Sequence, residues 1–150
     1  MIAFLDAECD DLLPYTSKIW CVSVLCNGVM KTYTDRDEFL EASKDWTAVC
    51  NHNLIGYDLY VLWKVWNIPF TIGPDTFNGK PVEFVDTLVL SRYLWSDRGF
   101  HSLEDWGTHL GHQKLEHKDF SCYSETMRVY CENDVLLTEK VYHHLMKEMN

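Results

Sequence analysis

A near-continuous apolar run that ends in two carboxylates opens this chain. Residues 2–8 read IAFLDAE, a pattern typical of a central strand that is buried on both faces of a sheet. Side chains two residues apart on a strand point to the same face, so Asp6 and Glu8 project together. Two like charges in a buried place repel each other unless a cation lies between them. The run therefore predicts a covered sheet with a candidate cation site at its edge, although Asp-x-Glu is common and an exposed loop is the alternative.

The remaining pattern predicts an α/β domain with a mixed sheet. Asn27-Gly28 favours a tight turn, so residues 17–26 and 29–34 are expected to form a hairpin. The later elements are expected in this order: a helix from Asp35 to about residue 43, a strand over 47–51, a helix over 58–66, a Gly/Pro-rich loop over 73–81, a strand over 82–86 that runs into a helix to about residue 95, a helix capped by Ser102, and a long helix over 124–149.

Length and composition are those of a globular protein. The 150 residues, 47% of them hydrophobic and 24% charged, predict a single domain over 1–150. No apolar run approaches the roughly 18 residues that span a membrane, and no signal peptide is recognised, so a soluble cytoplasmic protein without a membrane partner is expected. The six cysteines have no metal-finger spacing and are expected to be reduced.

The net charge of −10 argues against a protein that binds long duplex nucleic acid through a basic face. Such binding requires many Lys and Arg residues to neutralise phosphates. A small footprint on one or two terminal nucleotides stays open, because two bound Mg²⁺ ions would supply local positive charge.

Asp58 lies in NLIGYD, five positions after Asn53, where a second parallel strand is expected to lead into a helix. Considered alone, Asp58 is best explained as the N-cap of that helix. Ligands also gather at the carboxyl ends of strands in open α/β sheets, and the two interpretations are compatible.

The long final helix carries a polar interruption in its apolar face. Residues of this face recur at spacings of three and four: Met127, Tyr130, Asp134, Leu137, Val141 and Leu145. A lone carboxylate in such a stripe is costly to bury unless it meets a metal. Tyr130 lies one turn before Asp134, so its hydroxyl can reach the same small volume. A core tyrosine with a satisfied hydroxyl is the alternative.

Taken together, Asp-x-Glu, Asn-x3-Tyr-Asp and Tyr-x3-Asp resemble the motifs of the DEDD superfamily of 3′→5′ exonucleases. The tyrosine subclass is indicated, since the histidine subclass would place His where this chain has Val129. The segments VDTLVLSRYLWS and HSLEDWGTHLGHQKLEHKDF resemble more closely the proofreading exonuclease domains of bacteriophage-type family A DNA polymerases. The resemblance runs from Met1 to about Leu145, and no polymerase segments follow.

This resemblance implies a ribonuclease-H-like mixed β-sheet flanked by helices, with two Mg²⁺ or Mn²⁺ ions per active site. By similarity Asp6, Glu8 and Asp134 would hold the first ion, and Asp6 would bridge to a second that Asp58 positions partly through water. Tyr130 would orient the attacking water. Two such ions can activate water and stabilise a leaving 3′ oxygen.

Two residues are assigned to substrate binding by the same resemblance. Leu12 matches an apolar residue that wedges against terminal bases in similar domains, and an ordinary core leucine is the alternative. Asn53 opens the second motif.

The expected function is a 3′→5′ exonuclease that acts on single-stranded or frayed DNA and releases nucleoside 5′-monophosphates. A separately encoded DNA polymerase, with this chain as its proofreading partner, is a further hypothesis, and the location would be the host cytoplasm if a phage encodes it. One alternative is a 3′→5′ exoribonuclease of RNase D-like or oligoribonuclease-like type. The other is a catalytically silent polymerase-associated binding module, which the intact site residues disfavour.

Several other polar and aromatic residues are expected to be structural. Asp86 is interpreted as an N-cap, His143 and His144 as a solvated helix end, and most of the six tryptophans as core. His101 and His117 have no spacing that requires a phosphate contact.

Overall fold

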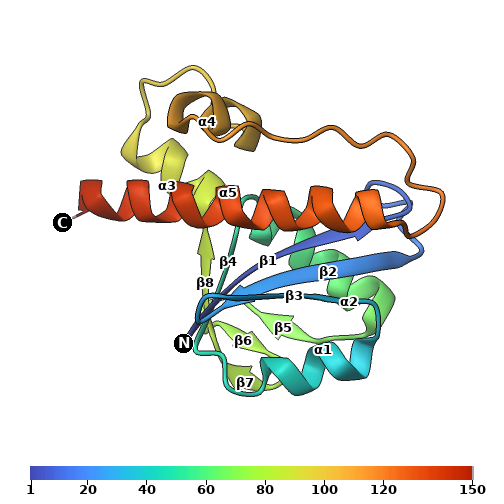
Figure 1. The fold of residues 1–150 in the computed structure, drawn as a ribbon. Coiled ribbons are helices and arrows are strands. Elements are labelled where there is room, and N and C mark those ends of the chain that lie inside the picture. Colours follow the sequence, from blue (N-terminus) through green and yellow to red (C-terminus); the bar gives the residue numbers. More distant parts are fainter. Residues whose placement is uncertain (150) are drawn as a thin grey trace.

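The computed structural model describes residues 1–149, and a five-stranded mixed sheet forms its centre (Figure 1). The strand order β3-β2-β1-β4-β8 places β1 in the middle. β1, β4 and β8 are parallel, whereas β2 and β3 are antiparallel to their neighbours. The predicted mixed sheet is therefore confirmed, with these strands: β1 (Ile2–Cys9), β2 (Ile19–Cys26), β3 (Val29–Tyr33), β4 (Ala48–Asn51) and β8 (Glu83–Asp86).

Helices cover both faces of this sheet. The longest, α5 (Glu125–Met149), crosses one face and contacts β1 to β4, and Figure 1 shows α1 (Arg36–Ser43) on the opposite side. The π-helical segment η1 (Leu54–Asp58) leads directly into α2 (Leu59–Trp66), which packs on β2. Both α3 (Thr87–Leu94) and α4 (Leu103–Leu110) pack against α5.

Successive side chains of β1 point to opposite faces of the sheet, and this alternation decides which helix the carboxylates of β1 face. The odd-numbered residues of β1 belong to the main core cluster on the α2 side: Ala3, Leu5, Ala7 and Cys9. Phe4 instead packs with Val135 and Tyr142 of α5. Asp6 and Glu8 follow Phe4 at steps of two, so they point toward α5. A slip of one residue would exchange the two faces, and burial of the apolar side chains, roughly 1.5–3 kcal/mol each, opposes it.

The predicted turn and the predicted caps at Asp35, Asp86 and Ser102 are confirmed. Asn27 and Gly28 have positive φ values of 52° and 76°, as a primed hairpin turn requires. The side chain of Asp35 accepts from the backbone N–H of Glu38 at the start of α1. Side chains also cap three later helices: Asp86 at α3, Ser102 at α4 and Ser124 at α5.

The segment expected to be an irregular loop over 73–81 contains regular structure. A second sheet of order β5-β6-β7 joins β5 (Phe70–Thr71), β6 (Thr76–Phe77) and β7 (Lys80–Pro81). Left-handed residues at Gly73, Asn78 and Gly79 turn the chain back between these strands. The prediction failed here because strands of two residues are too short to show an alternating pattern.

The prediction of a solvated helix end is confirmed for His143 and wrong for His144. His143 is exposed, but the ring of His144 stacks on Trp95 and contacts Trp106, with centroid distances of 6.2 and 5.4 Å. Of the tryptophans, Trp46 and Trp106 are buried and Trp63 is 55% exposed. All six cysteines are free. Among the described residues, no helix combines the length and apolar character needed to cross a membrane.

Candidate active site

Side chains from β1 and α5 line one cavity of about 410 Å³ at the end of the sheet. Four of the five residues predicted for catalysis line it: Asp6, Glu8, Tyr130 and Asp134. The fifth, Asp58, lies next to them and does not line the cavity. The motifs lie far apart in the sequence, so their convergence is a result of the fold.

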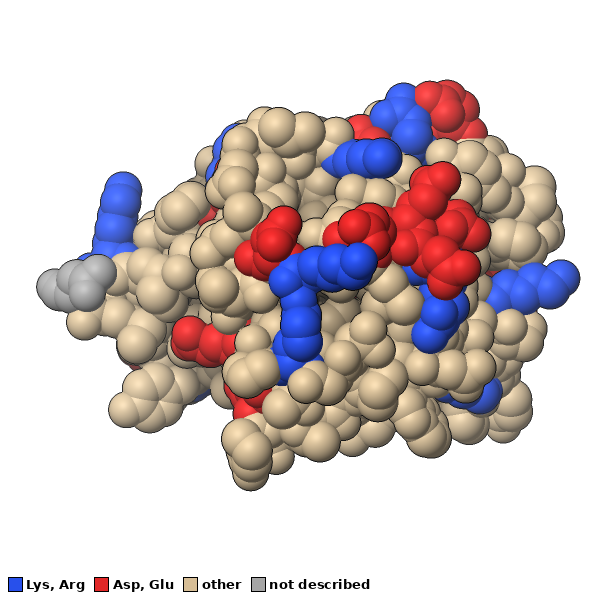
Figure 2. All heavy atoms as spheres, turned by 90° about the horizontal axis from the view of Figure 1, so that it is seen from below, with Lys and Arg blue, Asp and Glu red and all other residues tan. Residues whose placement is uncertain are grey.

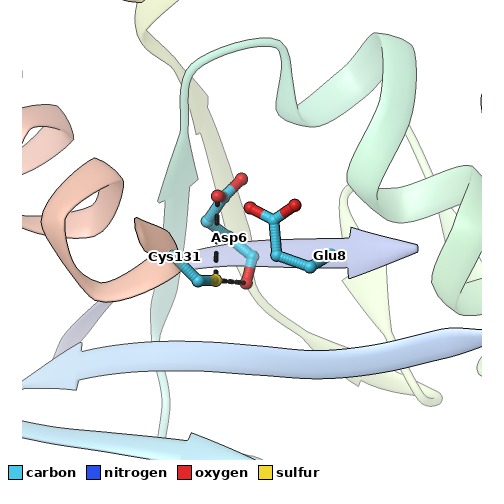
Figure 3. A group of neighbouring side chains, drawn as sticks. All are labelled: Asp6, Glu8 and Cys131. Carbon is cyan, nitrogen blue, oxygen red and sulfur yellow. Dashed lines mark hydrogen bonds between the residues drawn. The ribbon is translucent and has the colours of Figure 1, made fainter. Parts of the chain in front are cut away.

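Asp6 and Glu8 lie two residues apart on β1, and their side chains project from the same face of the strand, as Figure 3 shows. Asp6 is partly exposed and Glu8 is buried. Burial raises the pKa of Asp6, and burial together with the charges of Asp6 and Asp134 raises the pKa of Glu8 to about 10. Near pH 7, full ionisation of this pair is therefore unfavourable without a cation beside the carboxylates.

Asp134 reaches the cavity from the buried face of α5, and it is 5% exposed. Burial and the charge of Asp6 raise the pKa of Asp134 to about 7, against the opposing effect of Lys114. Lys114 Nζ lies 3.2 Å from Oδ2 of Asp134. The other oxygen, Oδ1, is buried and has no hydrogen-bond partner among the described residues. Such an oxygen is costly to bury unless a ligand completes its coordination.

Tyr130 is half-buried and shares Lys114 with Asp134. The ammonium of Lys114 donates to the hydroxyl of Tyr130 and lies 4.2 Å from the centroid of its ring. Burial raises the pKa of Tyr130, although the hydrogen bond from Lys114 opposes this shift. The phenol therefore stays neutral near pH 7 and keeps a proton to donate into the cavity. This placement favours the site interpretation of Tyr130 over a purely structural role in the core.

Asp58 is buried beside Asp6 and connected to it through Asn51. The amide Nδ2 of Asn51 donates to Oδ2 of Asp58 at 2.7 Å and to Oδ1 of Asp6 at 3.1 Å. Oδ1 of Asp58 accepts from the backbone N–H of Ala7 at 3.2 Å. The pairing of β1 with β4 ends at Phe4, so β4 offers no hydrogen-bond partner to the N–H of Ala7, and Asp58 accepts from it instead. Asp58 makes no side-chain capping bond, so the N-cap interpretation was wrong.

The two predicted substrate-binding residues lie in different places. Leu12 is 71% exposed and lines the cavity, so it is not a core leucine. Asn53 is exposed at the start of η1 in a left-handed conformation, where its backbone N–H donates to Asp86. It does not line the cavity, and its role in binding stays a prediction.

Comparisons with known proteins identify the fold. No protein-family model and no curated protein matches the chain. Among solved structures, NrnC of Brucella melitensis with bound Mg²⁺ superposes with a TM-score of 0.73 and 16% identity over 99% of this chain and 73% of that chain. The chain has the ribonuclease-H-like fold.

Two further structures share this ribonuclease-H-like fold. The Escherichia coli RNase D, an exoribonuclease involved in structured RNA processing, has a TM-score of 0.68 and 16% identity over 98% of this chain and 39% of its own. A family B DNA polymerase of Pyrobaculum calidifontis has a TM-score of 0.69 and 16% identity over 97% of this chain and 24% of its own. The predicted resemblance to phage family A polymerases stays a prediction.

Three residues of this ribonuclease-H-like site were not anticipated from the sequence: Asn51, Lys114 and Cys131. Asn51 ends a strand parallel to β1, so its position at this edge of the sheet could have been inferred from the sequence. Lys114 lies between α4 and α5, where no periodic pattern predicts a contact. Cys131 follows Tyr130, and the sequence predicted only that its thiol is reduced.

The site has the composition of a centre for hard divalent cations. Asp6, Glu8 and Asp134 supply carboxylate oxygens, the ligands that Mg²⁺ and Mn²⁺ prefer. Their raised pKa values and the unpartnered Oδ1 of Asp134 are both relieved by a bound cation. The described residues therefore fit a metal centre at this edge of the sheet.

Proposed function

We propose that this chain is a metal-dependent 3′→5′ exonuclease that acts on single-stranded or frayed DNA and releases nucleoside 5′-monophosphates. The observation that carries the proposal is the convergence of Asp6, Glu8, Asp134 and Tyr130 on one cavity. The unpartnered oxygen of Asp134 adds support, because it marks where a ligand is required.

Each carboxylate has a role that follows from its position. Asp6, Glu8 and Asp134 would hold one Mg²⁺ or Mn²⁺ ion, and Asp6 with Asp58 would hold a second, which Asp58 reaches through water. The amide of Asn51 keeps Asp6 and Asp58 apart at fixed separations. When bound, such a pair of ions supplies the charge that activates water and stabilises the leaving oxygen.

Tyr130 and Lys114 orient the reactants in this mechanism. The hydroxyl of Tyr130 positions the attacking water, whose oxygen forms a bond to phosphorus while the bond to the 3′ oxygen of the preceding nucleotide breaks. Lys114 holds that hydroxyl and Oδ2 of Asp134 in place. Its positive charge persists in the site, because Asp134 and Tyr130 raise the pKa of Lys114 despite the opposing effect of burial.

Surface charge favours a small footprint on the substrate. On the face in Figure 2, Lys and Arg side chains are separated by acidic and uncharged surface, and they form no continuous basic face there. The formal charge is −10. Binding therefore depends on a terminal nucleotide at the cavity, and the exposed Leu12 at its border would wedge against the last base.

A 3′→5′ exoribonuclease is the second candidate. Structures with the same fold include RNase D, described as an exoribonuclease, and NrnC bound to pGG. At 16% identity these likenesses show the fold alone. They are compatible with this candidate and do not distinguish a DNA substrate from an RNA substrate. Parallel assays on DNA and RNA of one sequence decide between the two substrates, because only RNA carries the 2′-hydroxyl. Proofreading for a separately encoded polymerase is a further part of the proposal, tested by co-elution of the two proteins.

One degradation assay tests the proposed reaction. With Mg²⁺, a single strand labelled at its 5′ end should give a ladder of shortening products, and the same strand labelled at its 3′ end should release labelled mononucleotide at once. A chelator and the Asp134→Ala variant should each stop the reaction, whereas Asp45→Ala, which alters an exposed carboxylate away from the cavity, should not. Binding of DNA without any turnover would instead favour a catalytically silent module.

A further inference from the structure

The thiol of Cys131 reaches a catalytic carboxylate. Cys131 is buried on α5, and its Sγ lies 3.3 Å from the backbone oxygen of Asp6 and 3.8 Å from Oδ2 of the same residue. Figure 3 shows Cys131 approaching Asp6 from the helix while Glu8 lies beside Asp6 on the strand. The proposed hydrolysis makes no use of this sulfur.

The separations of these side chains suit a shared cation. One ligand atom each from Asp6, Glu8 and Cys131 all lie within 4.8 Å of one another. Two ligands can bind one ion only if they are closer than the sum of their bond lengths, about 4.3–4.5 Å for a zinc–sulfur and a zinc–oxygen bond. Sγ of Cys131 and Oδ2 of Asp6 meet this condition at 3.8 Å.

A second observation points to a ligand beside Asp6 and Glu8, in the cavity that these two residues line and that Cys131 does not line. Asp134 lines the cavity together with Asp6 and Glu8, and it is 5% exposed. Its Oδ1 has no hydrogen-bond partner among the described side chains and backbone groups. A cation in the cavity would satisfy this oxygen as well as the carboxylates of β1.

We propose that Asp6, Glu8 and Cys131 form a binding site for a thiophilic divalent cation, Zn²⁺ or Cd²⁺, that overlaps the Mg²⁺ position of the proposed nuclease. Mg²⁺ takes oxygen ligands and gains little from a thiol, whereas zinc and cadmium bind thiolate strongly. The thiol proton leaves to solvent when the ion binds. The metal preference of this site therefore shifts toward thiophilic ions. The overlap with Mg²⁺ rests on the proposed function, but the binding itself does not.

The test measures metal binding directly on the full chain. The reduced, metal-free protein is titrated with Cd²⁺ in the presence of excess Mg²⁺, and the ultraviolet charge-transfer band of a cadmium–thiolate bond is recorded. Wild type should give this band with one equivalent of Cd²⁺. Cys131→Ser should lose it, with Cd²⁺ affinity reduced by more than about tenfold, since even partners outside the ligand set contribute 10–100-fold. Cys131→Ala replaces Cys131→Ser if circular dichroism shows that the serine variant is unfolded.

Three control variants separate Cys131 from the other thiols. Cys122→Ser removes an exposed thiol, and Cys21→Ser removes a buried thiol of the same core cluster as Cys131, so both should keep the band. Asp6→Asn leaves all six thiols in place and should lose it. Absence of the band in wild type, or its persistence in Cys131→Ser or in Asp6→Asn, would overturn the proposal. Because no step requires cleavage, an inactive protein that shows the band contradicts only the nuclease proposal.

Discussion

The ammonium nitrogen of Lys114 lies 3.2 Å from Oδ2 of Asp134, in a site where burial otherwise disfavours every negative charge. Lys114 thus offsets part of the repulsion among the carboxylates before any metal binds. Its side chain is 22% exposed and that of Asp134 is 7% exposed, so the pair is only weakly screened by solvent.

Lys114→Met should destabilise the metal-free protein above pH 7, by about 1–3 kcal/mol, because it leaves the Asp134 carboxylate without its partner. Urea unfolding in the presence of a chelator measures the effect. Lys118→Met removes an exposed lysine of the same segment and should change stability little. Equal losses in the two variants would show that the ion pair has no special role.

The pKa of Asp134 predicts how stability changes with pH. Its value in the folded protein is raised from 3.8 to about 7, so the folded state binds a proton that the unfolded state has released. The contribution of Asp134 to stability is then fully present below about pH 4 and is lost as pH rises through about 7. In metal-free protein, the free energy of unfolding of wild type should fall relative to that of Asp134→Asn over this window. If the difference in free energy of unfolding between the two proteins stayed constant with pH, the raised pKa of Asp134 would be contradicted.

Asp6→Ala and Asp134→Ala should each abolish cleavage, because each removes a proposed metal ligand. Each also removes a carboxylate whose charged form is disfavoured by desolvation, so both variants should stay folded and be at least as stable as wild type without metal. Cleavage assays and thermal unfolding by circular dichroism measure the two effects. Retained activity in either variant would contradict the site, and unfolding of both would indicate a structural role.

Tyr130→Phe should reduce the rate less, on the order of tenfold to a thousandfold, since a hydroxyl that orients water contributes less than the ions that activate it. Single-turnover cleavage measures this loss without contributions from product release. A loss as large as that of Asp134→Ala would show that Tyr130 does more than position water. An unchanged rate would assign Tyr130 to the core.

The pairing state of the nucleic-acid end and the exposed Leu12 should decide which substrates are degraded. Unstacking a terminal base costs a few kcal/mol, and least when the base is mismatched or single-stranded. We expect single strands to be degraded faster than blunt duplex, and circular single strands not at all. Leu12→Ala should slow the degradation of paired ends more than that of single strands. Val29→Ala, at a similarly exposed site on β3, should change neither rate. Cutting of circles would identify an endonuclease.

The sequence by itself determined the features that depend on neighbouring residues. Period-two alternation placed Asp6 and Glu8 on one face of β1, Asn27-Gly28 specified the hairpin, and helical spacing placed Tyr130 and Asp134 together on α5. These features follow from backbone geometry that repeats over two to four residues, so a single sequence reveals them. The motif resemblance then indicated which of these polar residues belong together.

Only the tertiary structure decided the contacts between these segments. Lys114 meets Asp134 from a stretch without periodicity, and Cys131 and Asn51 reach Asp6 across 125 and 45 positions of the chain. Asp58 is the last residue of η1 and does not cap α2 with its side chain, because its carboxylate accepts from the backbone N–H of Ala7 in β1. Such pairings depend on how buried apolar faces bring distant segments together, and that packing is not encoded in any local pattern.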